Sequence, residues 1–84
     1  MKIKVANYYS DGHHSTMRYT VPDIDLPRPL DVDNDEHLDQ LWDILYGYTG
    51  DGHAADNAAL GCLYEVEILD ATDPRLIGLI NEYA

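Results

Sequence analysis

Two short stretches hold the residue types that could do chemistry. YSDGHH (residues 9–14) and TGDGH (residues 49–53) each place an Asp and a His around a Gly, within reach of a Tyr. Carboxylates and imidazoles bind metal ions and transfer protons, and the chain also has one thiol. The candidates for a metal site or a catalytic site are therefore Asp11, His13, His14, Asp51, His53 and Cys62.

The spacing of these residues favours turns over a reactive centre. Adjacent histidines on a turn seldom converge on one ion, and no pair of Cys or His residues has the spacing of a zinc knuckle. No Gly-rich phosphate loop or nucleophile elbow is present. Asp and Gly are the residues that turns require, and His tolerates unusual backbone angles. We expect a protein that is not an enzyme and that has no metal site and no cofactor.

Charge is the strongest signal in the composition. The 84 residues hold 16 Asp and Glu against 5 Lys and Arg, for a net charge of -11. Residues 1–22 carry +2 and residues 23–84 carry -13, and residues 23–43 alone hold eight acids and one Arg. Such a field repels nucleic acid and membrane surfaces and attracts basic proteins. Apolar residues interleave with the acids, which argues against a disordered acidic tail.

The first third of the chain predicts a hairpin followed by an irregular segment. Residues 1–9 and 15–21 alternate apolar with polar residues, as the strands of a hairpin do, and SDGHH connects them. Residues 22–32 contain Pro22, Pro27 and Pro29, which break a regular ladder. An extended loop is expected there.

The stretch DNDEHLDQLWDILYGY predicts the main helix, near residues 34–47. Its apolar residues recur at intervals of three and four residues, and Asp33 and Glu36 have the spacing of a capping box. Helical geometry then places Asp35, Asp39 and Asp43 in one row about 6 Å apart, away from the apolar stripe. Like charges at that spacing destabilise a helix, and the helix dipole accounts only for the acids of the first turn. The row therefore suggests a use.

The last third predicts one more strand and a short helical turn. Residues 62–69 alternate apolar residues with Glu65 and Glu67, and residues 74–78 form a turn behind an Asp73 cap. Residues 54–60 are compatible with one or two turns, and residues 79–84 with either a strand or a helix. The fold class is therefore α+β: one compact domain over residues 1–84, with a small antiparallel sheet packed on one main helix.

A small, strongly acidic chain with carboxylates in rows resembles the DNA mimics with which phages and mobile elements block host defence enzymes, the anti-CRISPR and anti-restriction proteins. Residues 46–80, which include YTGDGH and LYEVEILDATDPRLIGL, are also similar to short acidic proteins of phages and bacterial mobile elements. The resemblance implies a partner-binding role for the acids: Asp23, Asp25, Asp31, Asp33, Asp35, Glu36, Asp39 and Asp43, with Glu65 and Glu67 as a second patch. Asp51 is expected to extend this surface.

The sequence thus predicts a non-catalytic inhibitor whose acidic face blocks the basic DNA-binding surface of a host complex, such as a CRISPR surveillance complex or a restriction enzyme. It would bind neither nucleic acid nor membrane directly, and would act in the host cytoplasm as a monomer or small homo-oligomer. The lone Cys62 and the lack of a long apolar segment favour that compartment. Two alternatives stay open: an interaction module of the antitoxin or phage-assembly kind that binds through Tyr46 or Tyr48, and a small metal-binding protein.

Overall fold

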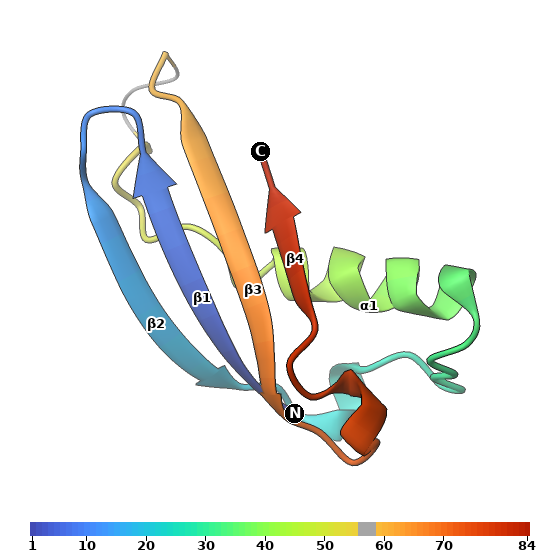
Figure 1. Cartoon of the computed structure of the whole chain (residues 1–84). Coiled ribbons are helices and arrows are strands. Elements are labelled where there is room, and N and C mark those ends of the chain that lie inside the picture. The colour runs from blue at the N-terminus through green and yellow to red at the C-terminus, as the bar shows by residue number, and fades with distance from the viewer. Residues whose placement is uncertain (56–58) are drawn as a thin grey trace.

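A four-stranded antiparallel sheet with one helix across one face makes up the fold, as seen in a computed structural model that describes residues 1–55 and 59–84 (Figure 1). The strands lie in the order β2-β1-β3-β4. They are β1 (Lys2–Tyr9), β2 (His14–Thr20), β3 (Cys62–Asp70) and β4 (Ile80–Tyr83), and the helix is α1 (Asp35–Tyr46). The predicted α+β class is confirmed.

Alternation along the strands divides the sheet into an inner and an outer face. Ile3 and Val5 of β1 lie opposite Ile68 and Val66 of β3, and all four side chains are buried. Lys4, between them in sequence, lies opposite Glu67 on the outer face. Because successive strand residues point to opposite faces, the inner face is apolar along most of its length, and the outer face carries charged residues together with exposed apolar ones such as Leu63 and Ile80.

Helix α1 covers the inner face with the apolar stripe that its sequence predicts. Leu41 and Leu45 are fully buried in the core, and Leu38 and Trp42 pack against it. The helix begins after Asn34, whose side chain accepts hydrogen bonds from the Glu36 and His37 backbone amides. Capping by Asp33 was a wrong prediction: Asn34, one residue later, has the extended backbone from which its side chain reaches those amides.

The connections follow the predicted pattern with added detail. Between β2 and α1 the chain forms a short 3₁₀ turn, η1 (Asp23–Asp25), and then an extended loop with a cis Arg28–Pro29 bond. The expected helical turn near 74–78 is the 3₁₀ turn η2 (Pro74–Leu76), capped by Asp73. Residues 79–84, left open between strand and helix, contribute β4.

The turn or turns expected within residues 54–60 fall partly on residues 56–58, which lie outside the described residues.

Over the described parts of the chain, no helix combines the length and the apolar character that crossing a membrane requires.

Candidate functional site

The exposed face of α1 carries the acidic row that the sequence predicts. Asp35, Glu36, Asp39 and Asp43 are all exposed, while the opposite side of the helix is buried. Within residues 1–55 and 59–84, none of these four carboxylates forms an ion pair. Their charges are therefore directed to solvent and available to a partner.

An aromatic pair closes the C-terminal end of this row. At about 100° per residue, Tyr46 falls on the same line of the helix as Asp39 and Asp43, and its side chain is 52% exposed. Its ring lies 5.1 Å from that of Tyr83 on β4. The Tyr83 hydroxyl donates to the Trp42 carbonyl oxygen at 2.6 Å, which fixes the pair. We call Asp35, Glu36, Asp39, Asp43 and Tyr46 the helix face.

The predicted acids ahead of the helix are exposed but differ in their contacts. Asp23 and Asp25 lie on η1. Asp31 is joined to the start of α1, because its amide donates to Nδ1 of His37 at 3.0 Å. Asp33 pairs with Arg75 at 3.3 Å. The charge of Asp33 is therefore partly neutralised, and Asp31 lies near the same arginine.

The second predicted patch lies on the outer face of the sheet, away from the helix. Glu67 pairs with Lys4 at 3.3 Å. Glu65 lies directly opposite Glu82 of β4, a like-charge pair that residue spacing in the sequence did not indicate. Such pairs destabilise a sheet when they lie directly opposite.

Three of the chain's cations lie on the outer face of the sheet, opposite the face that α1 covers. Lys4 and Arg18 are direct partners across β1 and β2, and Lys2 lies on the same outer face of the sheet. These are three of the five Lys and Arg residues. The outer sheet face thus carries both signs, whereas the four carboxylates of the helix face have no ion-pair partner among the described residues.

The two Asp-Gly-His stretches meet in space and form matching turns. In each turn the His backbone amide donates to Oδ1 of its own Asp at 3.0 Å, and the intervening glycine has a positive φ, 91° at Gly12 and 85° at Gly52. The aspartate closes the turn, and the glycine supplies a backbone conformation that other residues rarely adopt. Their turn character is as predicted, but their contact with each other was not.

The turns exchange side chains. His13 Nε2 lies 3.1 Å from Asp51 Oδ2, and His53 Nε2 lies 2.7 Å from Asp11 Oδ2. Since an ionised carboxylate only accepts hydrogen bonds, both imidazoles donate through Nε2. The two rings stack with centroids 3.8 Å apart.

Asp51 occupies the inner part of this contact. Its carboxylate accepts from the Tyr9 hydroxyl at 2.7 Å and from the Ser15 hydroxyl, and its side chain is only 13% exposed. The expectation that Asp51 extends the acidic surface does not fit this geometry, since its charge is directed inward. We call Tyr9, Asp11, His13, Ser15, Asp51 and His53 the double-turn cluster.

Hydrogen bonding in the double-turn cluster shifts the pKa of three groups. The Ser15 and Tyr9 hydroxyls hold the pKa of Asp51 well below its ordinary value. The hydrogen bond from His53, followed by that from the His13 amide, lowers the pKa of Asp11. Burial, together with the Asp51 carboxylate, raises the pKa of Tyr9. Both aspartates are therefore ionised acceptors near neutral pH.

The cluster lacks the geometry of a catalytic or metal centre. In a Ser-His-Asp triad the imidazole contacts the serine hydroxyl, whereas the Ser15 hydroxyl and His13 Nε2 both contact one oxygen of Asp51. No group of three or more His, Cys, Asp or Glu side chains among the described residues could hold a metal ion. His14 lies on β2, apart from these contacts.

Cys62 also stands apart from the imidazoles. It begins β3 and is half-buried, and its hydrogen bond is the main factor that raises the pKa of Tyr64, with burial next. Over the described residues, no hydrogen bond links the Cys62 sulfur to His53. A half-buried thiol thus lies beside a tyrosine at the start of β3.

No protein family, curated protein or solved structure matches this chain.

Proposed function

We propose that this protein is a non-catalytic inhibitor that mimics DNA and occupies the basic nucleic-acid-binding surface of a host defence complex. The observation that carries the proposal is the exposed row at Asp35, Asp39 and Asp43, which has no basic partner among the described residues. The candidate targets are a CRISPR surveillance complex or a restriction enzyme, met in the bacterial cytoplasm.

The row presents a line of charge that suits the proposed role. Duplex DNA carries a charge about every 3.4 Å along each strand, and carboxylates one helical turn apart stand about 6 Å from one another, roughly one for every two phosphates. This negative charge runs along the exposed side of α1 from Asp35 to Asp43. A groove lined with Lys and Arg would meet a line of charge in place of a phosphate backbone.

Tyr46 adds an uncharged anchor to the same surface. Exposed aromatic residues supply much of the binding free energy at protein interfaces, and Tyr46 lies on the line of the acids with a 52% exposed side chain. Charge would then give fast, salt-sensitive association and Tyr46 a slower dissociation. By contrast, Tyr48 is half-buried and packs on Tyr19 at 5.3 Å.

A plain protein-interaction module is the second candidate, because Tyr46 and Tyr8 are both substantially exposed, at 52% and 45%. In that case binding would be carried by apolar and aromatic surface. It would change little with salt, and duplex DNA would not displace the partner.

The decisive experiment reverses the row and measures DNA binding by purified defence complexes. We expect the variant with Asp35→Lys, Asp39→Lys and Asp43→Lys to lose the ability to block duplex DNA in a mobility-shift assay. Raising salt from about 50 to about 200 mM should weaken inhibition by the natural chain strongly. Far-UV circular dichroism should show that the helix is retained, since the three side chains are exposed.

A matched pair of milder variants tests whether position matters or only net charge. Asp39→Asn with Asp43→Asn removes two charges from the helix face, and Asp70→Asn with Glu82→Gln removes two exposed charges from β3 and β4. Only the first pair should weaken inhibition. Equal inhibition by both pairs and by the reversed variant would refute the proposal.

A further inference from the structure

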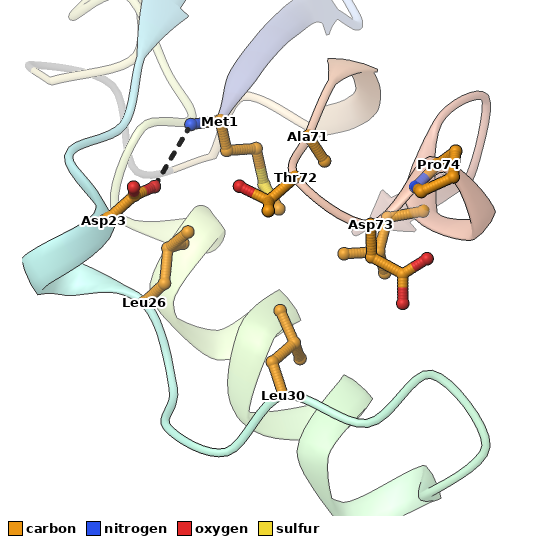
Figure 2. A pocket seen from close by; sticks show the side chains of 9 residues that line it. Met1, Asp23, Leu26, Leu30, Ala71, Thr72, Asp73 and Pro74 are labelled. Atoms are coloured by element: carbon orange, nitrogen blue, oxygen red, sulfur yellow. Dashed lines mark ion pairs between the residues drawn. The ribbon is translucent and has the colours of Figure 1, made fainter.

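A cavity of about 460 Å³ opens between η1, the following loop and the β3–η2 connection. Figure 2 shows Met1, Asp23 and Leu26 along one side, Ala71, Thr72 and Pro74 along the other, and Leu30 reaching in from the loop. This volume lies in the range of pockets that bind small ligands or large side chains. Its place in the fold is distinct from both the helix face and the double-turn cluster.

The floor of the cavity is apolar and firmly held. Leu76 is 2% exposed and belongs to the core, and Leu26 and Leu30 pack against that core. The Asp73 cap fixes η2, through its hydrogen bond to the Arg75 amide at 3.0 Å. A preformed apolar surface of this kind favours an apolar group without a large ordering cost.

The rim of the cavity holds two carboxylates. The Asp23 carboxylate is 72% exposed and forms an ion pair with the Met1 amine at 3.9 Å, the dashed line in Figure 2. That buried amine also donates to the Val21 carbonyl oxygen, at 3.0 Å. Asp73 also lines the cavity but is engaged by Arg75 at 2.9 Å. Asp23 is therefore the charge best placed to meet a bound cation.

We propose that this cavity is a docking site for a large apolar side chain flanked by Lys or Arg on a partner protein. The apolar floor would take the side chain, and Asp23 at the rim would meet the flanking cation. The inference deepens the proposed function, on which it rests for the basic character of the partner. It adds a second contact on a different part of the molecule. This contact would orient the helix face in the basic groove of the partner.

The chemistry of the site can be tested with three short peptides. Ac-Gly-Lys-Phe-Lys-Gly-NH₂ carries both features, Ac-Gly-Glu-Phe-Glu-Gly-NH₂ reverses the charge, and Ac-Gly-Lys-Ser-Lys-Gly-NH₂ removes the apolar side chain. Binding to the full chain is followed by the backbone amide shifts of Leu26, Ala71 and Thr72 in NMR titrations. We expect the Lys-Phe-Lys peptide to bind about tenfold more tightly than either of the others.

Variants of the chain separate the rim from the floor. Asp23→Asn should weaken binding of the Lys-Phe-Lys peptide about three- to fivefold, as expected for an exposed ion pair. Glu82→Gln, which removes an equal charge from β4, should leave it unchanged. Ala71→Leu should fill the cavity and abolish the shifts, and Asp23→Asn, on an exposed side chain, serves if that variant fails to fold.

The outcomes distinguish this inference from the function on which it rests. Equal binding of the Lys and Glu peptides, or shifts centred on Tyr46 and Asp39 instead of the cavity, would overturn it. If the peptides give such a result but reversing the helix row still abolishes competition with DNA, only the cavity proposal is rejected and the inhibitor proposal is retained. Selective peptide binding without any DNA competition would retain the cavity and remove the DNA mimic.

Discussion

The imidazole rings of His13 and His53 stack at a centroid distance of 3.8 Å and an interplanar angle of 13°, and each donates to the aspartate of the opposite turn. The β1–β2 connection is thereby joined to the segment that follows α1. The same kind of turn occurs twice in the chain, and the histidine of each turn contacts the aspartate of the other. The contact stabilises the end of the sheet where the inner face changes from apolar to polar.

Asp51 should contribute more to stability than Asp11, because its side chain is 13% exposed against 46% and it accepts from both Tyr9 and Ser15. Asp51→Asn places an amide donor against a hydroxyl and an imidazole that both donate. We expect a loss of about 1–2 kcal/mol in the free energy of unfolding, measured in urea.

Two other variants test whether the loss from Asp51→Asn comes only from removing a negative charge. Asp11→Asn and Asp43→Asn each remove the same charge as Asp51→Asn, the first from the exposed part of the cluster and the second from the helix face. Asp11→Asn should cost less than Asp51→Asn, and Asp43→Asn should be neutral or slightly stabilising. An equal loss from Asp51→Asn and Asp43→Asn would show that the cluster contributes nothing specific.

Acid should weaken the double-turn cluster. The pKa of Asp51 and that of Asp11 are both lowered in the folded state from 3.8, mainly by the hydroxyls of Ser15 and Tyr9 and by His53 respectively. A carboxylate with a depressed folded pKa contributes stability that is complete above its unfolded pKa and is lost as the pH falls through its folded pKa.

The measurement is the difference in unfolding free energy between the natural chain and Asp51→Asn, from about pH 7 to about pH 2. Taking the difference cancels the relief of charge repulsion that acid brings elsewhere on so acidic a chain. The difference should be constant down to about pH 5 and then shrink. A difference that stays constant to pH 2 would contradict the lowered pKa of Asp51.

Alternation and helical period were enough to predict β1, β2, β3, the helix and the exposed row, but did not decide between strand and helix for β4. The meeting of the two turns was not predictable in this way, because it depends on where the segment after α1 returns to the sheet. One local signal was present: Asn7 continues the inward series of Ile3 and Val5 and is fully buried. A polar residue at a core position indicates a buried polar network that must be satisfied.

The helix start shows a different limit. Asp33 and Asn34 are both good capping residues, so composition alone does not choose between them. In the structure Asn34 caps the helix, while Asp33 pairs with Arg75 beyond β3 and its amide donates to Asp31.

Removing the like-charge pair on the outer face should stabilise the sheet. Glu65 and Glu82 lie directly opposite on β3 and β4, and like charges in this position destabilise a sheet. We expect Glu82→Gln to raise the unfolding free energy by a few tenths of a kcal/mol, as measured in urea at low salt, with the gain shrinking in high salt.

Glu67→Gln is the matched control. It removes an equal charge from the same outer face of the sheet, but it breaks the ion pair with Lys4 at 3.3 Å. It should be neutral or destabilising. A gain equal to that of Glu82→Gln would mean that net charge, and not the opposed pair, is responsible.

Asn7 should be the most costly single position at this end of the sheet. Its Oδ1 accepts from the Gly50 amide at 2.8 Å and its Nδ2 donates to the Ser15 hydroxyl at 3.2 Å, within a residue that is 0% exposed. Asn7→Leu keeps the volume but leaves the Gly50 amide without its acceptor, a loss of about 1–3 kcal/mol.

The effect of Asn7→Leu should also reach the cluster, because the same Ser15 hydroxyl donates to Asp51. Combining Asn7→Leu with Asp51→Asn tests this in a double-mutant cycle, in which residues of one hydrogen-bond network give losses that do not add. We expect a combined loss smaller than the sum of the single losses by about 0.5 kcal/mol or more. Additive losses would mean that the Ser15 hydroxyl does not couple Asn7 to Asp51 energetically.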